Sequence, residues 1–135
     1  MVKGPNELIT GLVGEVTESV TEEMSAISVG SGTQHVFATP ALSALMEKTA
    51  YTSVIDYLDT ETCSVGSRTV LEHLAPTPVG STVKCITKLV KIEGRSLTFS
   101  FSVTDAAGEI AKGTHERVIV NVEKFLDRAA KRMIK

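Results

Sequence analysis

One stretch in the first half of the chain repeats its apolar residues at the spacing of an α-helix. Thr39 and Pro40 precede this repeat, and a hydroxyl residue at the N-cap followed by proline is a strong helix start. We therefore expect a helix with Thr39 as its N-cap that runs to about Tyr57 and buries one stripe. The stripe comprises Leu42, Leu45, Met46, Thr49, Ala50 and Val54.

The second half of the chain alternates β-branched and polar residues, which is typical of strands. The pattern occupies the segments 63–74, 82–92, 97–104 and 110–122. Turn-forming residues separate these segments at 76–80, 93–94 and 105–108. Parallel strands would need helical crossovers, and no helical pattern stands between the segments, so we expect antiparallel hairpins.

The two ends of the chain carry weaker patterns. β-Branched residues mix with polar ones over 8–20 and 24–29, which indicates strands or strand-like arms. Near the C-terminus, an apolar face opposite basic residues predicts a helix with a solvated basic surface. The apolar face comprises Val122, Phe125, Leu126, Ala129 and Met133.

One long helix followed by antiparallel strands predicts an α+β architecture in which the sheet curls around the helix. This is the pattern of a hot-dog fold, a curved antiparallel sheet wrapped around one long central helix. A chain of 135 residues is close to the size of one average domain, so we expect residues 1–135 to form a single domain.

The composition excludes several classes of partner. With no Trp, two Tyr, four Phe and a net charge of −2, the chain is not expected to bind nucleic acid. No apolar run reaches the length of a membrane span or of a signal-peptide core, so no membrane partner is expected. Cys63 and Cys85 form no Cys-x-x-Cys pair, which indicates free thiols and a cytoplasmic location. His35, His73 and His115 are too widely separated for a metal-ligand motif, so no metal is expected.

The small net charge hides an asymmetry between the two halves of the chain. Residues 1–61 contain nine acidic and two basic residues, whereas residues 62–135 contain seven acidic and twelve basic ones. The net charges are therefore −7 and +5. The basic half could meet a small polyanion such as a phosphate ester, although an ordinary solvated surface is the simpler interpretation.

The candidate chemistry rests on single polar residues, because neither a nucleophile elbow nor a phosphate-binding loop occurs. Glu47 stands one residue from the buried stripe, where a carboxylate needs a partner or a wet cleft. Its simpler interpretation is a Glu at the stripe edge that pairs with Lys48 or with water. Thr39 needs no role beyond the N-cap. His73 and His115, as single strand histidines, are more often structural or exposed than functional.

Several short motifs stand in a distinctive order along residues 36–125. They are Phe37-Ala38-Thr39, Leu45-Met46-Glu47, His73 with Ala75-Pro76 and Gly80, Gly113-Thr114-His115-Glu116-Arg117, and Glu123-Lys124-Phe125. In order and spacing, these motifs resemble the fluoroacetyl-CoA thioesterase family of hot-dog acyl-CoA thioesterases. Residues 30–34 supply no aromatic lid, so selectivity for a fluorinated acyl group is not carried over.

The resemblance implies hydrolysis of a small acyl-CoA thioester to the free acid and coenzyme A. It implies that Thr39, Glu47 and His73, with separations of 8 and 26 residues, form the catalytic group. It also implies that Gly66 and Arg117 contact the substrate. Finally, it implies a homodimer or higher homo-oligomer with sites at the subunit interface, and no cofactor apart from the coenzyme A of the substrate.

These residue types suit the reaction. A thiol leaving group has a pKa of about 8.5, so its departure needs little acid assistance. His73, with an ordinary pKa of about 6.5, would act as general base or proton shuttle. Glu47 would either orient His73 or attack as a carboxylate nucleophile. The Thr39 hydroxyl and the Gly66 amide would contact the carbonyl oxygen or a bound water.

The spacing of Thr39 and Glu47 on one helix restricts how they can cooperate. Eight residues separate their backbones by about 12 Å along the axis and about 80° around it. The side chains of Thr39 and Glu47 from one helix are therefore not expected to contact the same substrate atom. Either His73 bridges them, or the two residues come from different subunits across a shared interface.

Two other functions stay open. One is a hot-dog acyl-thioester dehydratase or hydratase, against which the position of Thr39 argues. The other is a non-catalytic acyl-CoA-binding module. Hydrolysis releases free thiol from acyl-CoA, hydration does not, and a binding module shows saturable binding without turnover.

Overall fold

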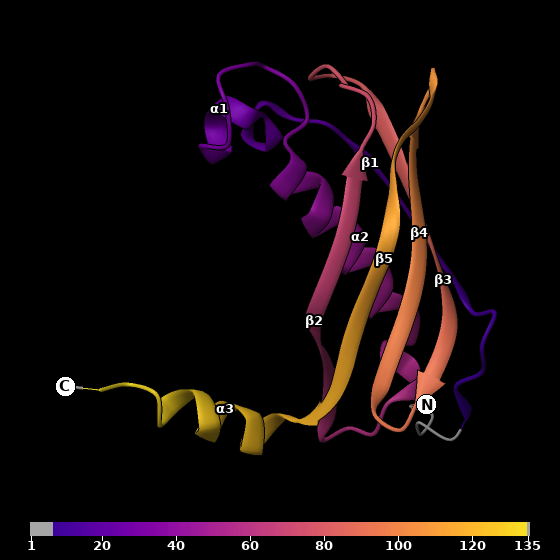
Figure 1. The fold of residues 1–135 in the computed structure, drawn as a ribbon, viewed down its shortest axis with the longest axis vertical. Helices are drawn as coiled ribbons and strands as arrows, with labels where there is room; N and C mark the ends of the chain where they lie inside the picture. The colour runs from indigo at the N-terminus through magenta and orange to yellow at the C-terminus, as the bar shows by residue number, and fades with distance from the viewer. Residues whose placement is uncertain (1–6, 135) are drawn as a thin grey trace.

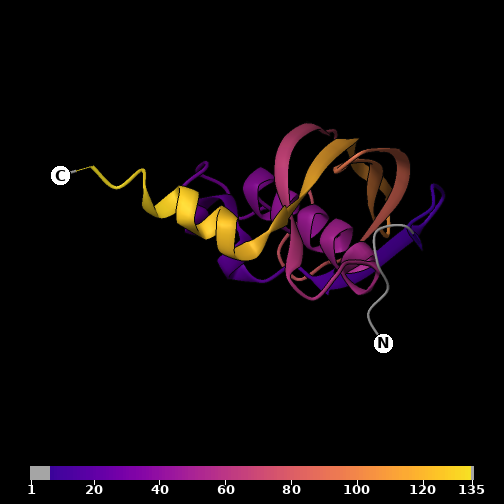
Figure 2. The ribbon, with the colours of Figure 1, turned by 90° about the horizontal axis from the view of Figure 1, so that it is seen from below.

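The computed structural model describes residues 7–134 as an antiparallel sheet that curls around one long helix (Figures 1 and 2). The sheet has five strands in the order β1-β3-β4-β5-β2. Their bounds are β1 Val13–Ser19, β2 Thr62–His73, β3 Thr82–Glu93, β4 Ser96–Asp105 and β5 Gly108–Asn121. The expected α+β architecture is confirmed, with β1 and β2 as its two edges.

Helix α2 (Thr39–Val54) is the central helix, and the 3₁₀ turn η3 (Ile55–Tyr57) carries it to the expected end. All residues of the predicted stripe are buried. The prediction of Thr39 as the N-cap is wrong by one residue, because Ala38 is the N-cap and Thr39 is already helical. Pro40 tolerates this shift, since the amides of the first turn need no partner within the helix. The Thr39 hydroxyl is therefore not used as a cap.

The buried stripe of α2 contributes to two apolar clusters that follow one another along the helix. The first includes Phe37, Leu42, Leu45, Met46, Val83, Cys85, Phe101, Val103 and Ile110. The second includes Ala50, Val54, Leu58, Leu89, Leu97, Phe99 and Ile119. Thr49, Thr87 and His115 are also buried, and on their elements they stand between members of the two clusters. The core thus contains a polar layer in its middle.

The segment 24–29 is not the expected strand. It contains the end of the 3₁₀ turn η2 (Glu22–Met24) and the short helix α1 (Ala26–Val29). Ser25 caps α1 by accepting a hydrogen bond from the Ser28 amide, and Gly30 ends it with a left-handed φ of 78°. The two caps stabilise the helical turn more than the strand propensity of the β-branched residues favours a strand, and the segment does not join the sheet.

The predicted C-terminal helix is present as α3 (Val122–Ala130). The Asn121 side chain caps it by accepting a hydrogen bond from the Lys124 amide. The helix extends away from the sheet (Figures 1 and 2), and none of its residues is buried. Met133, expected on its apolar face, lies beyond its end. Among residues 7–134, no helix has the length and apolar character needed to span a bilayer.

Strand β1, which covers 13–19 of the expected 8–20, approaches α2 closely at Gly14. Gly14 is opposite Thr87 of β3 in the ladder. A Cβ atom at Gly14 would lie 2.8 Å from the backbone oxygen of Thr49 and 2.8 Å from the Cβ atom of Ser53. Both distances are shorter than van der Waals contact, so this approach of strand and helix requires glycine.

We predict that Gly14→Ala lowers the free energy of unfolding by about 2 kcal/mol, the usual cost of overpacking. Urea denaturation followed by circular dichroism measures this change. Gly32→Ala is the matched control, since an added Cβ there would meet only the Ala26 Cβ atom, at 3.3 Å. Equal unfolding midpoints for the two variants would contradict the close approach at Gly14.

Candidate active site

Thr39 and His73, which are 34 residues apart in the sequence, meet at the start of α2. Thr39 Oγ1 lies 2.7 Å from Nδ1 of His73, the last residue of β2. The Nε2 atom of His73 is buried and has no hydrogen-bond partner among the described residues. Burial lowers the pKa of His73, and a backbone hydrogen bond with Ala75 acts in the opposite direction. The imidazole is therefore neutral near pH 7, with one ring nitrogen uncommitted.

A cleft of about 360 Å³ opens beside this pair. The N-terminal side of α2, the region of α1 and the segment after β2 contribute to its wall. Besides Thr39 and His73, the wall contains Ala26, Ser31, Val36, Phe37, Ala38, Leu74, Ala75 and Pro76. Most of these side chains are small or apolar, so the Thr39–His73 pair supplies the cleft with its reactive polar atoms.

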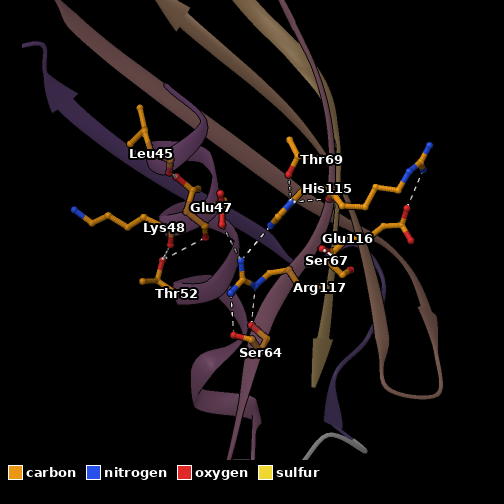
Figure 3. A network of polar contacts seen from close by, with 12 residues as sticks. Leu45, Glu47, Lys48, Thr52, Ser64, Ser67, Thr69, His115, Glu116 and Arg117 are labelled. Carbon is orange, nitrogen blue, oxygen red and sulfur yellow. Dashed lines mark hydrogen bonds and ion pairs between the residues drawn. The ribbon is translucent and has the colours of Figure 1, made fainter. Parts of the chain in front are cut away.

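Glu47 lies about two turns further along α2 and faces β2 and β5 (Figure 3). Its Oε2 atom is 3.9 Å from Nη1 of Arg117, and its side chain is 46% exposed. A Cβ atom at Gly66 would lie 3.1 Å from the same oxygen, so glycine leaves room for the carboxylate. The structure thus brings Glu47, Gly66 and Arg117 together.

Arg117 of β5 is a nearly buried cation, with only 6% of its surface exposed. Its Nε atom donates to Ser64 Oγ at 2.8 Å, and its Nη2 atom donates to the Ser64 carbonyl oxygen at 2.9 Å. Its Nη1 atom lies 3.1 Å from Nε2 of His115. Burial lowers the pKa of Arg117, and the Glu47 carboxylate opposes that shift. Arg117 therefore faces Glu47 and is not one of the exposed cations of the basic half.

Two interpretations of the sequence change here. Lys48 Nζ contacts Glu18 Oε2 at 3.0 Å, so the predicted pairing of Glu47 with Lys48 is wrong. The reason is that consecutive residues of a helix point in different directions. His115, to which the sequence assigned no role, is 1% exposed and lies next to Arg117. The alternation of β5 contained this signal, because residues two apart share one face of a strand.

The three residues expected to form the catalytic group do not all meet within one chain. Thr39 contacts His73, whereas Glu47 contacts Arg117. Among residues 7–134, no hydrogen bond or ion pair joins Glu47 to His73. His73 therefore does not bridge Thr39 to Glu47 within a single chain.

The curled antiparallel sheet around one central helix is that of a hot-dog protein, and Thr39, His73 and Glu47 carry side chains that can exchange protons. A family model described as fluoroacetyl-CoA-specific thioesterase matches residues 20–123. The chain belongs to this family.

Individual relatives agree with this assignment. The chain is 39% identical to the fluoroacetyl-CoA thioesterase of Streptantibioticus cattleyicolor over 90 residues. These residues make up 67% of this chain and 65% of that protein. The match thus spans just under two thirds of the relative. A solved structure of the fluoroacetyl-CoA thioesterase FlK superposes with a TM-score of 0.90 at 28% identity, over 94% of this chain and 98% of that one. A hot-dog-like protein from Thermanaerovibrio acidaminovorans, 23% identical with a TM-score of 0.85, covers 93% of each chain and shows the shared fold.

The lowered pKa values of His73 and His115 predict how stability depends on pH. The unfolded chain takes up protons on His73 and His115 near pH 6.5, whereas the folded chain resists them until a lower pH. The contribution of these two histidines to the free energy of unfolding should therefore be fully present above about pH 6.5. It should decrease as the pH falls from there towards the pKa values of the folded chain. Urea denaturation over a series of pH values measures this slope.

His73→Gln and His115→Gln should each flatten that slope, and the double variant should flatten it most. An unchanged slope in the double variant would show that neither histidine is responsible.

Proposed function

We propose that this protein hydrolyses a small acyl-CoA thioester to the free acid and coenzyme A. The observation that carries the proposal is the Thr39–His73 hydrogen bond of 2.7 Å in the wall of the cleft. The two residues occupy the positions that the family resemblance marks as catalytic. Small side chains such as Ala26, Ala38 and Ala75 in the wall leave room for a short acyl group.

The chemistry needs a nucleophile, a proton carrier and donors for the carbonyl oxygen. Either water or the Glu47 carboxylate adds to the thioester carbon, and the coenzyme A thiolate leaves. With water as nucleophile, a general base accepts the water proton; with Glu47, water then hydrolyses the resulting anhydride. The Thr39 hydroxyl and the Gly66 amide are the proposed contacts of the carbonyl oxygen.

The surroundings of Glu47 support its proposed role as a nucleophile. At 3.9 Å, Arg117 attracts the carboxylate electrostatically without forming a hydrogen bond of ordinary length. The side chain is about half exposed, so its oxygens remain accessible. Arg117 in turn would lie beside the reacting carbonyl, as expected of a substrate contact.

We also infer that the working unit is a homodimer whose sites combine residues of two chains. Within one chain, the backbones of Thr39 and Glu47 are about 12 Å apart along α2, and His73 contacts Thr39. Strand β2, which carries both His73 and Gly66, is an edge of the sheet, and among residues 7–134 no strand pairs with its outer side. A second copy against this edge would bring the Thr39–His73 pair of one chain towards Glu47 of the other.

A cytoplasmic location is the third part of the proposal. It is supported by Cys63 and Cys85, the two cysteines of the chain, which are both free and form no disulfide with one another. Reducing compartments keep such thiols unpaired.

Glu47→Gln and His73→Ala should each lower kcat/KM by at least about 100-fold, because each removes a group that moves protons or attacks the carbonyl. Release of free thiol from a panel of short acyl-CoAs measures the loss. Lys48→Gln is the control, since Lys48 is exposed and pairs with Glu18. If both site variants fold and keep full turnover, the assigned roles are wrong. Hydration without thiol release, or binding without turnover, would instead support the two alternative functions.

A mixture of the Glu47→Gln and His73→Ala proteins should regain activity that neither protein has alone. After subunit exchange, about one quarter of the wild-type activity is expected, since half of the dimers are mixed and each has one intact composite site. Each variant incubated alone under the same conditions is the control, and light scattering reports the oligomeric state. A monomer at micromolar concentration, or an inactive mixture that contains mixed dimers, would overturn the shared site.

A further inference from the structure

His115 occupies the centre of a polar chain that leads from β2 to Glu47 (Figure 3). Its Nδ1 atom lies 3.0 Å from the carbonyl oxygen of Arg68 and 2.7 Å from Thr69 Oγ1. Its Nε2 atom lies 3.1 Å from Nη1 of Arg117. The Arg117 guanidinium, held on its other side by Ser64, lies 3.9 Å from the Glu47 carboxylate.

The partners of His115 dictate its protonation state. The carbonyl oxygen of Arg68 can only accept a hydrogen bond, so Nδ1 must carry a proton. The guanidinium of Arg117 can only donate, so Nε2 must present its lone pair. Only the neutral imidazole with its proton on Nδ1 satisfies both contacts.

We propose that neutral His115 is a positioning residue, which fixes the Arg117 guanidinium and through it the place and charge balance of Glu47. The proposal rests on the function proposed above, because it gives His115 a part in the same site. His115 itself does not touch the substrate. Its ring is buried among β2, β4 and β5, with the ring centroid of Phe99 at 6.3 Å, which leaves it little freedom to turn.

Protonation of His115 would disrupt this arrangement. A proton on Nε2 removes the acceptor for Arg117 and places a second positive charge against the guanidinium. Burial and the charge of Arg117 lower the pKa of His115. Glu47 from α2, Glu116 from β5 and the backbone contact with Arg68 of β2 act in the opposite direction. The neutral form therefore prevails at neutral pH and is lost only in acid.

Two variants of His115 separate positioning from simple packing. In His115→Gln, the side-chain oxygen can take the place of Nε2 and accept from Arg117, but the group no longer titrates. In His115→Asn, the amide can take the place of Nδ1 and donate to Arg68, but it does not reach Arg117. We expect kcat/KM of the Gln variant to exceed that of the Asn variant at pH 8 by up to about 100-fold, the cost of a misplacement of about 1 Å in a site.

The pH profile provides a readout that packing alone would not change. The acid limb of kcat/KM should become shallower in His115→Gln, because one titrating group is lost while His73 remains. His35→Gln is the matched control; His35 is exposed, pairs with Glu22 and should leave the profile unchanged. Equal activity of the Gln and Asn variants, together with unchanged acid limbs, would overturn the proposal.

Nitrogen-15 NMR of the histidine rings tests the same proposal without activity. The expected spectrum shows His115 with a proton on Nδ1 and a bare Nε2 at neutral pH. A proton on Nε2 at neutral pH would overturn the positioning role. Absence of thiol release from every acyl-CoA would refute the proposed hydrolysis, and the NMR result would still decide whether His115 holds Arg117.

Discussion

The burial of one apolar stripe of α2 in the curl of the sheet is the constraint on which the candidate site depends. The stripe fixes the rotation of the helix, because turning it would expose side chains such as Leu42 and Met46, which are fully buried. Truncating side chains of this kind to alanine costs about 2–5 kcal/mol, so alternative rotations are excluded energetically. Residues that flank the stripe therefore point in fixed directions. Thr39 meets the end of β2, and Glu47 meets β5.

A second constraint is the charge of Arg117 within the core. A nearly buried guanidinium is tolerated only when hydrogen bonds and a counter-charge replace water. Ser64 and His115 provide the hydrogen bonds, and Glu47 provides the charge. The neutral state of His115 and the position of Glu47 are thus coupled through one cation. Any change that loosens Arg117 acts on the carboxylate as well.

Features of the sequence that reflect local physics were predicted well. The period of the stripe located α2, and alternation located β2 to β5, since burial of one face produces both patterns. The errors arose where a single local contact decided the outcome, as with the Ser25 cap and Gly30 that make 24–29 helical. Family spacing selected Thr39, Glu47, His73, Gly66 and Arg117. His115 was missed because the alternation of β5 places it on the same face as Arg117 but does not show that the two side chains meet.

The sequence by itself determined the helix, the strands, the family and the residue types available for acid–base chemistry, because these follow from periodicity, local caps and motif order. Only the tertiary structure decided which of these residues meet. The pairing of β2 with β5 places Gly66 opposite Arg117 and Thr69 opposite His115. The packing of α2 then places Glu47 beside Arg117 and Gly66, and Thr39 beside His73. These contacts join residues far apart in the chain, and their geometry depends on strand register and helix rotation, which no local pattern contains.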